Sequence, residues 1–240
     1  MLNKEQYHKR WNKKKVLQRV YKDLAKKMFD ESLPGLSLEV GSGIGELKND
    51  DNQKIIRIDI QKSKNLDIVA DAHYLPFLDK SFSNIFLFDV LHHLDCPLEF
   101  LSEANRVLNK GGRIIMIEPG ITPISKIFYK LFHQEPVEMS WRPKINCRPR
   151  RNKDPYDSNQ AIPTLLFFKY HELLKEKNIS FKILKKDWIS LFAYPLSGGY
   201  KSWSLIPLFM VNFVLKIENL LTPYIGRLFA FRLICVLEKN

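Results

Sequence analysis

The sequence predicts an α/β fold built on a doubly wound, mostly parallel β-sheet. Apolar runs of strand length alternate with short helical patterns between residues 36 and 117, which is typical of parallel sheets. A glycine-rich turn follows the first run directly. Acidic residues stand where later runs end, and such sheets bind ligands at the carboxyl ends of their strands.

The first segment of the chain is strongly basic. Its apolar residues recur three to five positions apart from residue 3 to residue 28, which predicts an amphipathic helix that residues 30–35 end. Three roles are open for this helix: a lid over a ligand cleft, a contact with an anionic membrane, or a cover for the sheet edge. The third is the simplest interpretation.

The strands are predicted next. Five runs of the required length lie at residues 36–40, 55–59, 66–70, 83–90 and 113–117. A helix is expected over residues 97–108, because Leu98, Leu101 and Ala104 show helical spacing and Gly111 and Gly112 follow as a stop signal.

The turn after the first strand carries the strongest chemical signal. Glu39 closes the apolar run, and Gly41, Gly43 and Gly45 follow at alternate positions around Ser42. Glycine reaches positive φ without strain and lets a ligand approach the backbone closely. The turn therefore predicts a nucleotide-type site, although glycine loops also occur without one.

Aspartates close the next three strands. Asp59 can accept hydrogen bonds from a ribose diol, and Asp71 can accept one from an adenine amino group while Ala72 offers its amide. Asp89 closes the fourth strand beside the expected reacting end of the ligand. A single such aspartate is usually a turn residue, but three at neighbouring strand ends indicate one adenosine pocket.

Length and composition limit the number of domains and the cellular compartment. The length of 240 residues fits one α/β domain with a full core. Cys96, Cys147 and Cys235 lie far apart without metal-ligand spacing, so neither a zinc site nor a disulfide is expected, and a reducing compartment fits best. We find no secretory signal and no apolar run long enough to span a bilayer, and expect a cytoplasmic protein, with peripheral membrane binding left open.

The net charge of +12 is concentrated in residues 1–28 and 142–153. Such clusters attract nucleic acid, anionic lipid or a phosphorylated substrate, or only keep a protein soluble.

In these motifs the sequence resembles the class I S-adenosylmethionine-dependent methyltransferases, in the type 11-like group that acts on small molecules and lipids. The resemblance covers residues 38–119, including Glu-Val-Gly-Ser-Gly-Ile-Gly, Asp71-Ala72, Val-Leu-His-His-Leu and the Gly111-Gly112 turn. It implies a Rossmann-like methyltransferase fold of seven strands, with 180–184 and 229–238 as an antiparallel last pair. It implies S-adenosylmethionine as cofactor, held by Glu39, Gly41, Ser42, Gly43, Gly45, Asp59, Ile60, Asp71, Ala72, Phe88 and Asp89.

Two features depart from the family. The helix after the glycine turn is shorter than usual, and strand four lacks the Asn/Asp-Pro-Pro-Tyr type sequence of enzymes that methylate base nitrogens. Nucleic acid is therefore not favoured as the acceptor. A nicotinamide-binding Rossmann protein is the nearest rival, but its third glycine should stand at residue 46, which is Glu.

The division that we expect is a basic helical segment (1–35), a cofactor-binding core (36–120), an acceptor cap (121–178) and the last two strands with an apolar helical insertion (179–240). Insertions at strand ends are where such folds form acceptor pockets. His133, Glu135 and Asn159 are the candidate acceptor residues there. The run 203–215 is apolar nearly all round and is expected to be a buried cap or core helix, with a membrane-surface element as the alternative.

Two function classes remain. The first is a methyltransferase for a small, lipidic or lipid-linked saccharide acceptor, with His93 as first and His92 as second candidate for the base that takes the acceptor proton. The second is an RNA-modifying or nucleic-acid-binding protein, which only the basic charge favours. A cofactor-binding fold without catalysis also fits. No metal is expected, and neither the acceptor atom nor the oligomeric state follows from the sequence.

Overall fold

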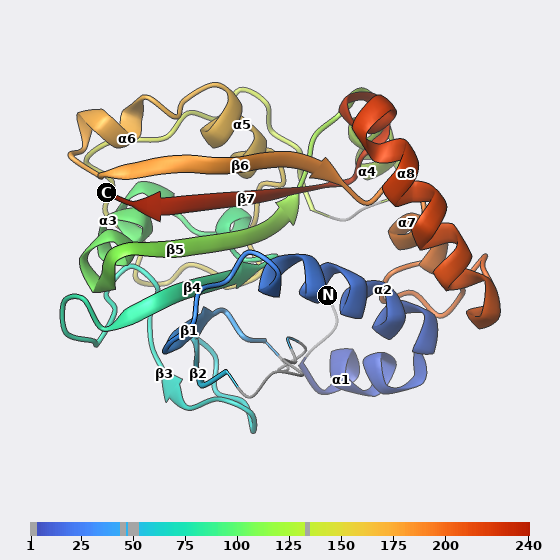
Figure 1. Cartoon of the computed structure of the whole chain (residues 1–240), viewed down its shortest axis with the longest axis horizontal. Coiled ribbons are helices and arrows are strands. Elements are labelled where there is room, and N and C mark those ends of the chain that lie inside the picture. The colour runs from blue at the N-terminus through green and yellow to red at the C-terminus, as the bar shows by residue number, and fades with distance from the viewer. Residues whose placement is uncertain (1–3, 44–46, 48–52, 133–134) are drawn as a thin grey trace.

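The sheet is seven-stranded in the computed structural model, which describes residues 4–43, 47, 53–132 and 135–240. Its order is β3-β2-β1-β4-β5-β7-β6 (Figure 1). The strands are β1 (Ser37–Val40), β2 (Ile55–Asp59), β3 (Ile68–Val69), β4 (Phe82–Phe88), β5 (Leu108–Pro119), β6 (Phe181–Ile189) and β7 (Arg232–Lys239). Pairing is parallel from β3 to β5, and β7 runs antiparallel to both β5 and β6. This confirms the predicted doubly wound, mostly parallel sheet.

Helices cover both faces of this sheet (Figure 1). They are α1 (Lys4–Lys13), α2 (Lys15–Phe29), α3 (Pro97–Val107), α4 (Pro123–Phe132), α5 (Ile162–Phe168), α6 (Leu173–Glu176), α7 (Ala193–Ser197) and α8 (Val211–Phe229), with 3-10 turns η1 (Leu91–His93) and η2 (Leu208–Met210). The predicted helix 97–108 is α3, whose first residue, Pro97, suits a helix start because it needs no amide partner there.

The core follows from the two-residue period of β5. Ile114 and Met116 pack into one buried cluster with residues of α3 and α5, and Ile115 and Ile117 pack into another with residues of α2 and α8. Successive side chains of a strand point to opposite faces, so a run that is apolar at every position predicts a strand covered on both sides. Because the sheet is packed on both faces, it forms a rigid support for the side chains at its strand ends.

The predicted single N-terminal helix is two helices that meet at Lys14. The Lys14 ammonium donates to the carbonyl oxygens of Ser197, Lys201 and Trp203, at 2.6, 2.9 and 2.5 Å. These partners lie 183 or more positions after Lys14 in the sequence, so the periodicity of the N-terminal segment could not predict the break between the two helices. Leu24 and Met28 of α2 are buried against the face of the sheet rather than its edge, so the edge-cover interpretation is wrong.

The apolar segment near the C-terminus also differs from the prediction. The helix extends through Pro223 to Phe229, whereas the apolar run in the sequence covers only residues 203–215. By length and composition the stretch Leu208–Phe229 is sufficient to cross a membrane, and only 17% of its most apolar window is buried. The expectation that no segment reaches membrane-spanning length is therefore wrong, as is the expectation of a buried helix.

Candidate functional site

A cavity of about 680 Å³ lies at the carboxyl ends of β1, β2 and β4. Ten of the eleven predicted cofactor residues line it, and the eleventh, Gly45, lies outside the described residues. The ten are Glu39, Gly41, Ser42, Gly43, Asp59, Ile60, Asp71, Ala72, Phe88 and Asp89. The acidic strand ends thus converge on one pocket, as the sequence predicted; the ligand group that each binds remains a prediction.

The glycine turn forms one wall. Gly41 has φ +68°, and a Cβ there would lie 2.6 Å from Val90 Cγ2, so no larger residue fits beside Val90. Gly43 has φ +55°, and within the described part of the chain its added Cβ would meet nothing nearer than 3.9 Å. The second glycine therefore borders open space that a ligand can enter. The predicted short helix after this turn falls largely on residues 44–46 and 48–52, outside the described part of the chain.

Two carboxylates fix this wall to the sheet. The Gly43 amide donates to Asp59 Oδ2 at 2.9 Å, and the Gln61 amide donates to Asp59 Oδ1 at 2.7 Å. Glu39 is buried, with its Oε2 3.1 Å from Arg57 Nε. The pocket therefore presents negative charge at two strand ends.

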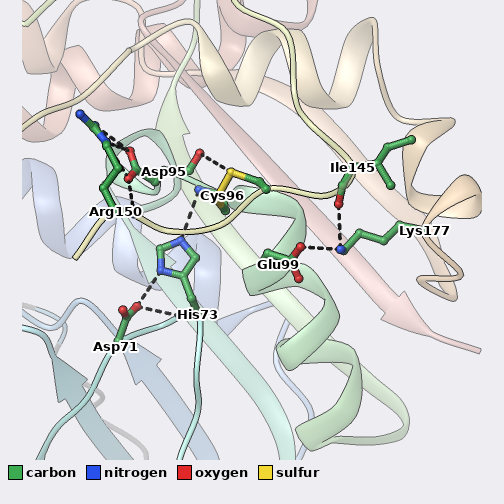
Figure 2. The surroundings of a disulfide bond; sticks show 9 residues. Asp71, His73, Asp95, Cys96, Glu99, Ile145, Arg150 and Lys177 are labelled. Atoms are coloured by element: carbon green, nitrogen blue, oxygen red, sulfur yellow. Dashed lines mark hydrogen bonds and ion pairs between the residues drawn. A yellow bond between two sulfur atoms is a disulfide. The ribbon is translucent and has the colours of Figure 1, made fainter. Parts of the chain in front are cut away.

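Asp71 is held by a histidine that the sequence analysis did not single out (Figure 2). The buried His73 ring lies with Nδ1 2.7 Å from Asp71 Oδ1, and the Cys96 amide donates to its Nε2 at 3.3 Å. Because Nε2 accepts, the proton of a neutral ring is on Nδ1 and is donated to Asp71. This chain of bonds orients the predicted adenine-binding carboxylate.

Cys96 and Cys147 form a disulfide, so the expectation that no disulfide forms is wrong (Figure 2). Their 51-residue separation matches no short spacing motif, and only the folding of the insertion back over the start of α3 brings them together. Cys235 is free and buried in β7. The cysteines therefore no longer argue for a reducing compartment.

The disulfide fastens a basic loop to the pocket. Arg150 binds Asp95 through two nitrogens, Nε at 3.0 Å and Nη2 at 2.8 Å, and Lys177 Nζ donates to the Ile145 carbonyl at 2.9 Å (Figure 2). This loop contributes Pro149, Arg150, Arg151, Lys153, Pro155 and Tyr156 to the cavity lining. The cavity lining therefore contains both acidic strand ends and cations of this loop, which suits a ligand with both kinds of charge.

His92 is a structural cation. The fully buried Glu118 carboxylate lies 2.7 Å from His92 Nδ1 and accepts the amides of Val90 and Leu91, while Glu135 Oε2 lies 3.4 Å from His92 Nε2. Burial would lower the pKa of His92, but the hydrogen bonds to both carboxylates raise it to about 10. Donor atoms of His92, His93 and Glu135 lie within 4.8 Å of one another, and the His92–Glu135 contact in this cluster is an ion pair.

His93 has the opposite character. It is half-buried and lines the main cavity, and its Nδ1 lies 3.4 Å from the Asp157 carbonyl oxygen. Burial, and then the charge of His92, lower its pKa to about 4. A neutral ring that donates from Nδ1 keeps a lone pair on Nε2, so His93 rather than His92 is suited to accept a proton.

Arg232 is a site residue that the sequence analysis missed. It is buried at the start of β7 and forms an ion pair with Asp89, whose φ is +57°. Its guanidinium lies 4.3 Å from the Tyr194 ring and 5.4 Å from the Phe88 ring. Burial opposes the charge, but Asp89 keeps the pKa of Arg232 above its usual value. The available sequence signal was an arginine directly before the apolar run 233–237, because an antiparallel last strand begins at the carboxyl edge of the parallel strands.

Two of the predicted acceptor residues, Glu135 and Asn159, are not part of the main cavity. Glu135 accepts hydrogen bonds from Gln160 Nε2 at 2.9 Å and Ser158 Oγ at 3.0 Å. Asn159 is buried and accepts the Glu138 amide at 2.9 Å, beside a second, smaller cavity. His133 lies outside the described residues.

Comparison with known proteins gives a consistent result. Residues 38–116 match the family described as "Methyltransferase domain". A demethylmenaquinone methyltransferase of Staphylococcus saprophyticus is 30% identical over 141 residues, which are 52% of this chain and 58% of that protein. The chain spans about three fifths of the length of the curated relatives first matched.

Solved structures share the fold over nearly the whole chain. A SAM-dependent methyltransferase of Archaeoglobus fulgidus matches 93% of this chain and 94% of its own, with 17% identity and a TM-score of 0.57. One from Thermotoga maritima matches 98% of both chains, with 14% identity and a TM-score of 0.58.

Proposed function

We propose that this chain, whose residues 38–116 match a methyltransferase domain family, is a class I S-adenosylmethionine-dependent methyltransferase that transfers a methyl group to a lipidic or lipid-linked saccharide acceptor. The observation that carries the proposal is the double character of the cavity. Acidic strand ends and a glycine turn line it together with a cationic loop that also contributes Tyr156.

The acidic side fits S-adenosylmethionine. Asp59 and Asp71 offer acceptor oxygens suited to the ribose hydroxyls and the adenine amino group, and Gly43 leaves room beside them. Glu39 and the glycine turn would hold the methionine portion, near Phe88 and Asp89. When bound, the cofactor supplies an electrophilic methyl group on its sulfonium sulfur.

The chain itself contributes alignment, exclusion of water and a base. Tyr21 of α2 stacks on Phe88 with ring centroids 4.9 Å apart and lines the cavity with Ala25, so α2 covers the expected methionine end. Holding two reactants in line removes much of the entropic cost of reaction. His93 would take the proton of a hydroxyl acceptor through Nε2.

The cationic side supports an acceptor that carries an anionic group. Arg151 and Lys153 line the cavity, and Lys153 Nζ is oriented by the Asp157 carbonyl at 2.6 Å. A phosphate on a lipid-linked saccharide matches this charge. Two Staphylococcus relatives are named demethylmenaquinone methyltransferases, so a quinone belongs among the acceptors to be tested. We propose that the enzyme works in the cytoplasm, where its Cys96–Cys147 disulfide would be unusual.

A nucleic-acid acceptor is the second candidate, and it rests on the basic clusters. A single-stranded polynucleotide would stack on exposed aromatic side chains among the cations. Trp141 is instead partly buried against Tyr129 and Phe231, and Tyr156 Oη lies 3.3 Å from Gln61 Oε1 at the cavity. Neither ring is therefore a fully exposed platform for stacking.

The test is methyl transfer from isotopically labelled S-adenosylmethionine to a lipid-linked saccharide, a quinone and an RNA. Labelling of the lipid-linked saccharide supports the proposal. The variant Arg151→Ala should then raise the KM for this acceptor about tenfold at unchanged kcat, because it removes binding energy that ground state and transition state share. Arg142→Ala is the matched control, since Arg142 is exposed in the same loop outside the cavity. Labelling of RNA alone would contradict it.

A further inference from the structure

The helix α8 exposes an apolar stripe along its whole length. Its members recur three or four residues apart and therefore share one face of the helix. They are Phe213, Ile217, Leu220, Tyr224 and Leu228 of α8, which we call the α8 stripe together with Phe209 of the preceding turn η2. Phe209 is 84% and Tyr224 82% exposed, so these rings are almost fully in water.

The opposite face of α8 is fastened to the domain. Glu218 is buried within the helix and accepts the amides of Phe192 at 2.9 Å and Ala193 at 2.8 Å. Gly226 lies against Trp188, where an added Cβ would be 3.1 Å from Trp188 Cβ. Since one face is bonded into the protein, the stripe is presented outward and the helix lies along the surface.

The apolar exposure continues beyond α8. The neighbouring helix α4 exposes Ile127, Leu131 and Phe132, and the loop that leads into η2 exposes Trp203 and Leu205. Figure 1 shows α4, α7 and α8 at the end of the molecule toward which the arrow of β5 points. Exposed apolar surface of this extent marks an interaction site.

The charged side chains around the α8 stripe indicate which kind of partner binds it. The exposed ionisable side chains of α4 and α8 are Lys126, Lys130, Lys216 and Arg227, all of them basic. At 100° per residue Lys216 and Arg227 fall along one border of the α8 stripe. Lys and Arg beside an aromatic and leucine-rich face are the composition of helices that lie in the interface of an anionic bilayer.

We propose that the α8 stripe docks this protein on an anionic lipid bilayer, with α8 parallel to the membrane plane. Phe213, Leu220 and Tyr224 enter the boundary between headgroups and acyl chains, and the four cations face anionic headgroups. The loop that precedes α8 carries Tyr200, which lines the main cavity. Docking therefore brings the cavity wall close to the bilayer, whichever acceptor the enzyme uses.

Co-sedimentation tests the docking without any methyl-transfer assay. The wild-type chain is mixed with sucrose-loaded vesicles of phosphatidylcholine, with or without phosphatidylglycerol, at physiological ionic strength. We expect binding to the anionic vesicles. The double variant Phe213→Glu with Leu220→Glu should bind them at least about tenfold more weakly, because two charges would enter the apolar layer.

Three controls make the outcome decisive. Leu78→Glu changes an equally exposed leucine, 83% exposed, in a loop away from α8 and should bind as wild type does. Lys216→Glu with Arg227→Glu should remove the preference for anionic vesicles. The double variant should keep its melting temperature, since the replaced side chains are exposed.

Two results would overturn the proposal. The first is wild-type protein that remains in the supernatant when anionic vesicles are sedimented, because the α8 stripe then does not bind lipid. The second result is a wild-type protein that does not bind vesicles and is a dimer in light scattering. If the double variant Phe213→Glu with Leu220→Glu is then a monomer, the stripe binds a second copy of the chain and not lipid.

Discussion

His73 donates a hydrogen bond to Asp71 over 2.7 Å, and the same ring accepts the amide of Cys96. The carboxylate expected to bind adenine is therefore anchored to one half of a disulfide. The other half lies in the basic loop of the cavity. Cofactor side and acceptor side are thus joined by a short covalent and hydrogen-bonded path.

The first prediction concerns this anchor. His73→Ala should weaken S-adenosylmethionine binding about tenfold. Without His73 the Asp71 side chain is no longer held in one orientation, and the entropy lost in ordering it reduces the binding free energy. Calorimetric titration measures the effect. His8→Ala, at an exposed position of α1, should bind as wild type does. Equal affinity of the two variants would show that Asp71 needs no support.

The disulfide gives the second prediction. Cys147→Ser should lower the free energy of unfolding by about 2–4 kcal/mol, because the unfolded chain regains the freedom of a long loop. It should also raise the KM for the acceptor while leaving cofactor affinity nearly unchanged, since the loosened loop carries Arg151 and Lys153. Cys235→Ser serves as the comparison for the loss of a thiol outside the disulfide. An unchanged KM would mean that the loop is held by other contacts.

His93 is the subject of the third prediction. His93→Ala should reduce kcat at least about a hundredfold with cofactor binding intact, as expected for removal of a general base. Because the pKa of His93 is lowered to about 4, the acid limb of the kcat/KM profile should fall near that value and not near 6.5. Activity within threefold of wild type would exclude this histidine as the base.

The fourth prediction uses the raised pKa of His92. A folded-state pKa of about 10 against an ordinary value of 6.5 means that the ion pairs contribute their full stability below pH 6.5 and lose it as the pH rises through 10. Urea unfolding of wild type and His92→Gln should differ most below pH 6.5, by about 3–5 kcal/mol for loss of a buried charge partner. A difference that stays constant to alkaline pH would show that His92 is neutral.

The sheet and the cofactor cavity were accessible to sequence reasoning because their signals are local. A strand such as β5 shows its double burial in consecutive apolar residues, and Asp59 and Asp71 stand directly at strand ends. Parallel topology then brings these ends to one edge. No knowledge of distant contacts is needed for either inference.

The missed features all depend on contacts between distant segments. The Cys96–Cys147 bond, the break at Lys14 and the Asp89–Arg232 pair join residues 51 to 189 positions apart. The continuation of α8 beyond residue 215 and across Pro223 also depends on tertiary packing, because proline removes a backbone donor from the helix. Side chains such as Glu135 and Asn159 looked suited to an acceptor, but their hydrogen-bond partners come from the fold of the insertion.

Calorimetric titration of S-adenosylmethionine into the wild-type protein and into Asp59→Ala tests the central claim most directly, with NAD titrated in parallel. We predict a single site for S-adenosylmethionine on the wild type, affinity at least about tenfold lower in Asp59→Ala because a charged hydrogen-bond partner is lost, and no binding of NAD. Binding of S-adenosylmethionine that Asp59→Ala leaves unchanged, or heat from NAD alone, would contradict the assignment of this cavity.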